Sequence, residues 1–254
     1  MSDLTIIICA YKATKELTLC LHQLAQFGVT KDELLIYENS PAYYSENRNL
    51  LNKYGIKFID NPGGGHADTV NKALQEVKTK YALLLDSDCI CLADPHEILQ
   101  HVKNKGYDLF GDICGDRGGY RLHKRVHPWY CFMNVEFLKK HNIPFTDFKR
   151  VQMTNSMSFY DFKQLASVRD PRFVYYDVGS TMYEDVIGFR GSVGDIGERF
   201  PYWHKEGSSW YMEHGHQGFI RLGLQKDAEF ENVKQQLFTS EEVLKKNADP
   251  ESAG

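Results

Sequence analysis

Residues 81–88 read Tyr81-Ala82-Leu83-Leu84-Leu85-Asp86-Ser87-Asp88, an apolar run that ends abruptly in two acids. A continuous apolar run of this length is typical of a strand buried on both faces of a parallel sheet. Ligands of open sheets bind beyond the carboxyl ends of such strands. We therefore expect both carboxylates to project toward a ligand.

The chain before this run alternates between strand-like and helix-like patterns. Strands are predicted at residues 4–10, 34–37 and 57–60, and helices around residues 17–25, 47–54 and 70–77. This alternation predicts a parallel sheet with helices on both faces. Four loops then converge on one edge, and they carry Tyr11-Lys12, Glu38-Asn39, Gly63-Gly64-Gly65 and Asp86-Ser87-Asp88.

The alternation fades after about residue 105. Glycine, charge and aromatic residues mix in the stretch 106–135, and helical periodicity returns weakly near residues 135–141 and 160–168. Residues 170–225 show little regular pattern, and from about Ser240 the chain is charged and poor in aromatic residues. We expect a helix and a frayed end there.

Composition bounds the class of protein. The 254 residues carry a formal charge of −4, with 42% hydrophobic and 25% charged residues, which is globular usage. This balance argues against a dedicated nucleic-acid binder. The six cysteines show no metal or redox spacing, no apolar run approaches the roughly 18–20 residues of a membrane span, and the start lacks a signal-peptide pattern. We expect a cytoplasmic protein with reduced thiols.

The two neighbouring carboxylates of Asp86 and Asp88 predict a bound cation. Two carboxylates this close repel each other unless a cation or a proton lies between them. Mg²⁺ and Mn²⁺ take oxygen ligands and bridge to substrate phosphates, so a nucleotide diphosphate is the expected partner. The alternative is a pair of N-cap residues for a helix that begins ahead of Ile90.

The order and spacing of these motifs resemble the nucleotide-sugar-binding half of a GT-A glycosyltransferase, most similar to family 2. The resemblance covers residues 4–92 well and the remainder more loosely. It implies an α/β, Rossmann-like, mostly parallel sheet flanked by helices, with an irregular C-terminal acceptor-binding half. The implied organisation is a nucleotide-sugar-binding half at 1–105, an acceptor-binding and catalytic half of the same domain at 106–225, and a C-terminal helix and tail at 226–254.

The resemblance also implies roles for matching residues of the first half. The backbone around Ala10 and Tyr11 and the carboxylate of Glu38 would hold the base of the nucleotide. The remaining donor contacts would come from Gly65, Asp86 and Ser87, with Asp86 on the ribose or sugar and with Asp88 on the metal. The family's glycine is missing from Glu38-Asn39-Ser40-Pro41, which leaves the choice of base open.

Two motifs of the second half match more loosely. Glu184-Asp185 resembles the family's acidic pair, in which one carboxylate removes the proton of the acceptor hydroxyl; we favour Asp185, and a pair of solvated acids at a helix start is the alternative. His204 resembles a histidine that completes the metal site beside Asp86 and Asp88, with His214 and His216 as competitors. A mixed Asp/His site favours Mn²⁺ over Mg²⁺.

Aromatic and basic clusters in the second half have two interpretations each. One interpretation is that aromatic side chains stack on sugar rings, and the other is that they pack in the core. These alternatives apply to Trp129, Tyr130, Trp210 and Tyr211. The basic residues would either face a phosphate of the acceptor or leaving group, or lie in a solvated loop. These residues are Arg117, Arg121, His123, Lys124, Arg125 and His127.

The sequence thus predicts a metal-dependent, inverting glycosyltransferase that uses Mn²⁺ or Mg²⁺. Its donor would be a nucleotide-diphosphate sugar, with a UDP-sugar slightly favoured. Its acceptor would be a glycan or a lipid-linked hydroxyl, which the protein would reach by docking peripherally at the inner face of a membrane. One alternative is a non-catalytic GT-A module that binds a nucleotide sugar or glycan. Another is a haloacid-dehalogenase-like phosphatase, whose metal motif resembles Gly111-Asp112 with Asp116.

Overall fold

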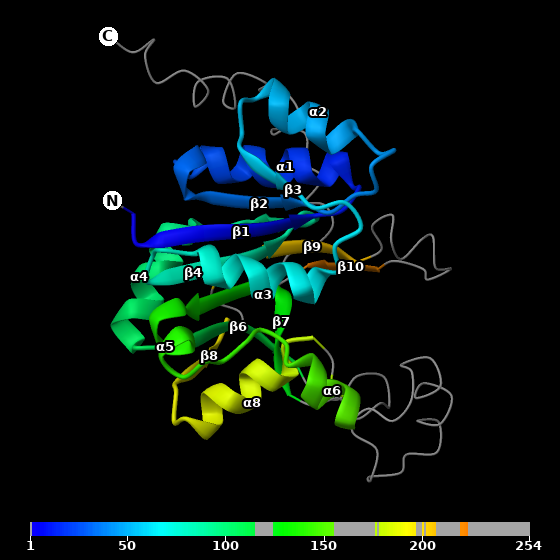
Figure 1. Ribbon diagram of the computed structural model, residues 1–254. Coiled ribbons are helices and arrows are strands. Elements are labelled where there is room, and N and C mark those ends of the chain that lie inside the picture. Colours follow the sequence, from blue (N-terminus) through cyan, green and yellow to red (C-terminus); the bar gives the residue numbers. More distant parts are fainter. Residues whose placement is uncertain are drawn as a thin grey trace.

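The apolar run that ends in Asp86 forms a central strand of a seven-stranded sheet. The computed structural model describes residues 2–114, 124–154, 176, 178–196, 200, 202–206 and 219–222, with only the backbone described for 114, 152–154, 202–206 and 219–222. The strand order is β3-β2-β1-β4-β7-β6-β8 (Figure 1). The bounds are β1 Leu4–Ala10, β2 Leu34–Glu38, β3 Phe58–Asp60, β4 Tyr81–Asp86, β6 Leu109–Cys114, β7 Arg125–Asn134 and β8 Val193–Asp195.

The sheet is mostly parallel. The pairs β3–β2, β2–β1, β1–β4 and β6–β8 are parallel, whereas β7 runs antiparallel to both β4 and β6. The register sets Ala10 beside Glu38 and Cys9 beside Asp86. The carboxyl ends of β1, β2 and β4 therefore meet at one edge of the sheet.

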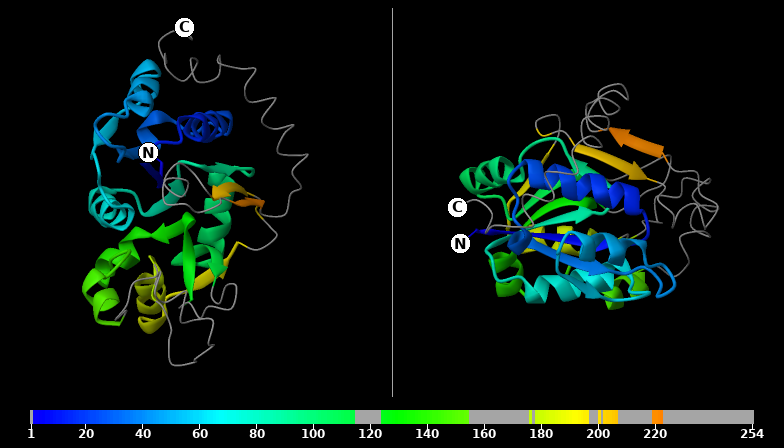
Figure 2. Two further views of the ribbon diagram at one scale, coloured as in Figure 1. Left: turned by 90° about the vertical axis from the view of Figure 1, so that its right-hand side faces the viewer. Right: turned by 90° about the horizontal axis from the view of Figure 1, so that it is seen from above.

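Helices cover both faces of the sheet, as the alternation predicts. The helices are α1 Thr14–Gln26, α2 Glu46–Lys53, α3 His66–Glu76, α4 Pro95–Lys105, α5 Val135–Lys140, α6 Phe148–Thr154 and α8 Ser180–Gly188, and η1 Lys31–Glu33 is a short 3₁₀ turn. Side chains of α1, α2 and α4 pack in one apolar cluster and those of α3, α5 and α8 in a second. In Figure 2, left, α1 and α3 lie on opposite sides of the strands.

The apolar run of β1 supplies both clusters, because successive side chains of a strand point to opposite faces. Ile6 and Ile8 pack in the cluster of α1, and Ile7 and Cys9 pack in the cluster of α3. All four are at most 5% exposed. Burial on both faces explains why the sequence is continuously apolar here rather than alternating.

The predicted GT-A-like α/β architecture is confirmed, with helices and strands where the first hundred residues predict them. The helical periodicity near residues 135–141 corresponds to α5. The predicted helix near 160–168 and the tail from 226 onward lie outside the described residues. The sequence pattern does not predict the regular elements α4, β6, β7, α6, α8 and β8.

A second, small sheet lies beyond the end of β4. Its order is β10-β9-β5, with β5 at Cys89–Cys91, β9 at Tyr202–Glu206 and β10 at Phe219–Leu222 (Figure 1). In its register Cys89 lies opposite His204. The small sheet therefore brings a late segment of the chain next to Asp86-Ser87-Asp88.

Two expectations drawn from composition can be compared with the described residues. None of the helices described is long and apolar enough to cross a membrane. Five cysteines, namely Cys9, Cys20, Cys89, Cys91 and Cys131, are buried free thiols. Burial raises the pKa of the Cys91 thiol to about 12. All five pack as small side chains in the two apolar clusters of the sheet.

Gly111 allows β6 and β7 to approach each other at a register shift. A Cβ at this position would lie 2.5 Å from both the carbonyl oxygen of Tyr130 and Cγ1 of Val126. We expect Gly111→Ala to lower the free energy of unfolding by roughly 1–3 kcal/mol, the usual range for overpacking a core. Urea unfolding measures this loss. Gly188→Ala in α8 is the matched control, because a Cβ there meets nothing within 4 Å, and equal losses in the two variants would contradict the packing argument.

His96, at the start of α4, links this helix to η1. Its Nε2 lies 2.9 Å from Oε1 of Glu33 and its Nδ1 lies 3.2 Å from Oδ1 of Asp94. Burial lowers the pKa of His96, but the hydrogen bond and charge of Glu33, with those of Asp94, outweigh burial and raise it. Burial raises the pKa of Glu33, but hydrogen bonds from Ser2, Thr30 and His96 outweigh burial and lower it.

The contribution of His96 to stability is expected to depend on pH. A raised folded-state pKa gives a contribution that is complete below the unfolded-state pKa and is lost as the pH rises through the folded-state pKa. The lowered pKa of Glu33 gives a contribution that is lost as the pH falls through its folded-state value. We expect His96→Gln to cost roughly 0.5–1 kcal/mol near pH 5.5, the range of a partly exposed pair, and less near pH 9. Urea unfolding at both pH values measures this difference, and an equal cost at both would contradict the ion pair.

Candidate functional site

The carboxyl ends of the parallel strands assemble the predicted residues of the first half. β1 ends at Ala10, β2 at Glu38 and β4 at Asp86, and the parallel register sets these ends side by side. Gly63-Gly64-Gly65 leads from β3 into α3 at the same edge. The structure therefore brings Ala10, Glu38, Asp86 and the glycine loop together.

Asp86-Ser87-Asp88 turns from β4 into β5. Asp86 is partly exposed, with 22% of its side chain accessible, whereas Ser87 and Asp88 are buried. The turn leads into a strand and not a helix, so the N-cap alternative for Asp86 and Asp88 is wrong. The capping residue nearby is Asp94, which accepts a hydrogen bond from the backbone of His96 at the start of α4. Neither of the two predicted carboxylates therefore caps a helix.

The glycine loop is tied to this turn by a histidine that the sequence analysis did not single out. His66 is the first residue of α3, and its Nε2 lies 3.0 Å from Oδ1 of Asp86. Its ring also meets the ring of Phe145 edge-on at 6.1 Å. Gly63 has a φ of 74°, a left-handed conformation that glycine adopts without strain. The position of His66 directly after the glycine loop was the one sequence signal for its contact with Asp86.

Glu38 is fully buried, and both of its carboxylate oxygens accept hydrogen bonds from the chain. It is 0% exposed, and its Oε1 accepts a hydrogen bond from the backbone of Ser40 at 2.8 Å. Its Oε2 accepts one from Nδ2 of Asn47 at 2.9 Å. A contact between Glu38 and a nucleobase remains a prediction, while its bonds to the chain are already made.

The loop after β1 has an unusual backbone. Lys12 and Ala13 have φ values of 52° and 49°, in the left-handed region that residues with a Cβ rarely adopt. This conformation costs roughly 1–2 kcal/mol per residue. Such conformations persist where the surrounding structure enforces them, and they cluster at functional sites. Tyr11, a predicted donor-binding residue, directly precedes this strained pair.

The acidic pair of the second half lies within α8. Glu184 and Asp185 are the fifth and sixth residues of this helix, so the alternative of acids at a helix start is wrong. Nη1 of Arg150 donates to Oδ1 of Asp185 at 2.7 Å, and Nη2 lies 3.7 Å from Oε2 of Glu184. The hydrogen bond to Asp185 raises the pKa of Arg150. Tyr176 donates to Oε1 of Glu184 at 2.8 Å.

Hydrogen bonds connect α3 to α8 through the segment between α5 and α6. Nδ2 of Asn71 donates to the carbonyl oxygen of Thr146 at 2.9 Å, and the backbone of Gly179 donates to Oγ1 of Thr146 at 3.2 Å. The backbone of Asp147 donates to Oγ1 of Thr181, and Nη2 of Arg150 donates to the carbonyl oxygen of Thr181. The helix that follows the glycine loop is thereby linked to the helix that carries the acidic pair.

The predicted metal ligands are only partly within the described structure. Backbone pairing sets His204 opposite Cys89, one residue after Asp88, but the side chains of β9 lie outside the description, as do His214 and His216 entirely. In the ranges whose side chains are described, no group of three His, Cys, Asp or Glu could hold a metal ion. The carboxylates of Asp86 and Asp88 are oxygen donors of the kind that Mg²⁺ and Mn²⁺ take.

The aromatic and basic candidates of β7 belong to the core. Trp129 is 5% and Tyr130 0% exposed, so core packing is confirmed for both. Arg125 and His127 are buried in the same strand, and neither lies in a solvated loop. Nη1 of Arg125 donates to the carbonyl oxygen of Val178, and the ring of His127 stacks on that of Trp129. Other members of these predictions lie outside the described residues, namely Arg117, Arg121, His123, Trp210 and Tyr211.

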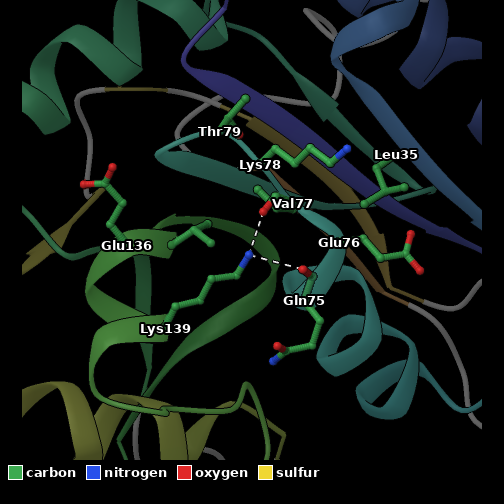
Figure 3. A pocket seen from close by; sticks show the side chains of 9 residues that line it. Leu35, Gln75, Glu76, Val77, Lys78, Thr79, Glu136 and Lys139 are labelled. Carbon is green, nitrogen blue, oxygen red and sulfur yellow. Dashed lines mark hydrogen bonds between the residues drawn. The ribbon is translucent and has the colours of Figure 1, made fainter.

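A cavity of about 730 Å³ lies at the opposite edge of the sheet, between the end of α3 and the start of α5 (Figure 3). Nζ of Lys139 donates there to the carbonyl oxygens of Gln75 and Val77, at 3.2 Å and 2.7 Å. Thr79 also lines the cavity, just before the amino end of β4. None of the predicted site residues lines it, so the candidate site is the carboxyl edge.

Comparison with known proteins gives one family and several distant relatives. The model of "Glycosyl transferase family 2" matches residues 5–168. The teichoic acid poly(glycerol phosphate) polymerase of Staphylococcus epidermidis is 33% identical over 95 residues, which are 35% of this chain and 13% of the polymerase. The chain therefore matches a small part of that relative. The family match favours a glycosyltransferase over the phosphatase alternative.

Two solved structures match part of the chain at low identity. TarS 1-349 of S. aureus is 18% identical, with a TM-score of 0.46 over 70% of this chain and 58% of that chain. A mannosyltransferase from Pyrobaculum calidifontis, in complex with GDP-Man and Mn²⁺, is 12% identical, with a TM-score of 0.45 over 57% of this chain and 47% of that chain. The chain thus covers about half the length of these two structures.

Proposed function

The chain belongs to glycosyl transferase family 2, and on this premise we propose that it transfers a sugar from a nucleotide-diphosphate donor to an acceptor hydroxyl. The observation that carries the proposal is the meeting of Ala10, Asp86 and the glycine loop at the carboxyl edge of the parallel strands. Ligands of open α/β sheets bind at this edge.

The donor would lie along the ends of β1 and β4. The backbone of Ala10 and Tyr11 would face the nucleotide, with Glu38 beneath them. Gly65, which precedes α3, would let the donor approach the backbone closely, and Asp86 and Ser87 would contact its ribose or sugar. The partly exposed carboxylate of Asp86 is accessible for such a contact. A UDP-sugar is the donor we favour.

A divalent cation, Mn²⁺ or Mg²⁺, fits the donor atoms of this turn. Asp88, with Asp86 and with His204 from the adjacent strand β9, would hold it. When bound, the cation would neutralise charge on the leaving diphosphate. Two carboxylates on one turn repel each other without a counter-charge, and this repulsion supports the assignment.

Asp185 would act as the general base of an inverting, single displacement. It would take the proton of an acceptor hydroxyl as the oxygen attacks the anomeric carbon from the face opposite the diphosphate. Nη1 of Arg150 donates a 2.7 Å hydrogen bond to this carboxylate and so fixes its orientation. Glu184, which also faces Arg150, is the alternative base. The acceptor we propose is a glycan or a lipid-linked hydroxyl, reached from the cytoplasm at the inner face of a membrane.

Asp185→Asn is expected to lower sugar transfer by roughly 10²–10⁴-fold, the usual contribution of a general base, and to leave nucleotide affinity within about twofold. Donor hydrolysis and transfer to a panel of acceptors measure activity, and titration calorimetry measures affinity. Glu184→Gln is the matched control on the neighbouring carboxylate. Loss of activity in Glu184→Gln alone would move the base to Glu184, and binding without turnover in the unaltered protein would indicate a non-catalytic module.

Asp88→Ala is expected to remove most of the Mn²⁺-dependent part of nucleotide binding, because it deletes a carboxylate of the cation site. Thermal shift with UDP, GDP and dTDP, each with and without Mn²⁺, measures this effect and identifies the preferred base. Asp32→Ala is the control, because Asp32 is an exposed acid in η1, before the amino end of β2. If Asp88→Ala bound every nucleotide as tightly as the unaltered protein does in Mn²⁺, the metal role would be wrong.

A further inference from the structure

A buried polar cluster lies directly beneath the ends of β1 and β2. We call it the Asn47 cluster; its members are Lys12, Thr14, Glu38, Ser40 and Asn47. Glu38, Ser40 and Asn47 are 0% exposed, and Lys12 is 6% exposed. Buried polar groups are costly unless their hydrogen bonds are made, so such a cluster fixes the geometry of the segments that form it.

Asn47 is the hub of the cluster and comes from a different element than its partners. Its Nδ2 donates to the carbonyl oxygen of Lys12 at 2.8 Å and to Oε2 of Glu38 at 2.9 Å. Its Oδ1 accepts a hydrogen bond from Oγ1 of Thr14 at 2.6 Å. One side chain of α2 thus joins the loop after β1, the start of α1 and the end of β2.

Glu38 and Ser40 complete the connection. The backbone of Ser40 donates to Oε1 of Glu38 at 2.8 Å, and Oγ of Ser40 accepts the backbone N–H of Lys12 at 2.7 Å. The N–H and the carbonyl oxygen of Lys12 are therefore both held by side chains of the cluster. Each carboxylate oxygen of Glu38 also has a partner within the chain.

These bonds hold a backbone that would not form by itself. Lys12 and Ala13 are two successive residues with a Cβ, and both have left-handed φ values. A left-handed conformation of such residues persists only where its surroundings enforce it. The pair directly follows Tyr11, so it sets the direction in which the chain leaves the proposed donor site.

We propose that Asn47 is a positioning residue of the nucleotide site, which holds the left-handed turn at Lys12–Ala13 and so orients the backbone of Ala10 and Tyr11 toward the donor. Glu38 supports the same turn through its hydrogen bonds with Ser40 and Asn47. The part of this inference that concerns nucleotide binding rests on the proposed function. The part that concerns the backbone of Lys12 and Ala13 does not.

The test uses Asn47→Ala in the full chain. Calorimetry with UDP, GDP and dTDP should show affinity about tenfold weaker for each nucleotide that binds, a change that corresponds to about 1.4 kcal/mol. The factor should be similar for all bases, because the variant disturbs the backbone and not a base contact. Asn49→Ala is the matched control, since Asn49 is an exposed asparagine on the same helix.

Rescue by glycine separates positioning from a general loss of stability. Glycine adopts the left-handed conformation without strain, so Ala13→Gly should restore a large part of the lost affinity in the Asn47→Ala background. A merely structural role would leave the affinity of the double variant as weak as that of the single one. Altered nucleotide selectivity in Asn47→Ala, with the affinity for the best base unchanged, would instead show a local effect on base recognition and overturn the inference.

Two further measurements keep the inference testable. Thr14→Val removes only the 2.6 Å bond to Asn47 and the 2.8 Å bond to Tyr44, and Tyr44→Phe removes the second bond alone. Thr14→Val should weaken nucleotide binding more than Tyr44→Phe does, and equal effects would count against Asn47 as the hub. Amide hydrogen exchange at Lys12 needs no nucleotide and should speed up in Asn47→Ala. Unchanged exchange there would overturn the inference, whereas fast exchange in a protein that binds no nucleotide would overturn only the proposed function.

Discussion

Parallel pairing of β1 with β2 and β4 is the constraint on which the rest of this structure depends. Parallel strands need crossover connections, so the intervening helices must lie on the faces of the sheet. The strands then lose contact with water on both faces, and only apolar side chains such as Ile6, Ile7 and Leu84 fit there. Every strand that runs in this direction also ends at the same edge. The polar residues of that edge are thereby collected without any long-range recognition between them.

The polar residues of this edge are hydrogen-bonded to one another, and they differ in how deeply they are buried. Glu38 and Asn47 are fully buried, and their bonds fix the backbone around the end of β1. Asp86 lies nearer the surface and meets His66 from the glycine loop. The deeper layer stabilises geometry and the outer layer keeps an accessible carboxylate. A site built in this way is rigid where the nucleotide would be positioned and open where it would be contacted.

The secondary structure of the first hundred residues could be predicted because the hydrophobic period of each segment is a property of neighbouring residues. Period and chain order suffice to predict alternating strands and helices, and a parallel sheet follows from that order. The strands β6 and β7 were missed because their residues carry signals of other kinds. β7 includes Arg125, His127 and Pro128 within a fully buried strand, and Gly111 interrupts β6 where the two strands change register. Burial of Arg125 depends on partners such as Val178, more than fifty residues away.

By itself the sequence determined the α/β class, the parallel core and the edge at which a ligand would bind, because hydrophobic period and element order are properties of neighbouring residues. Only the tertiary structure decided what each polar side chain touches. It buried Trp129 and Tyr130, set Arg150 against Asp185, brought β9 beside β5 and placed Nδ2 of Asn47 against the carbonyl oxygen of Lys12. These outcomes depend on contacts between segments far apart in the chain, for which the amino-acid order carries no local signal.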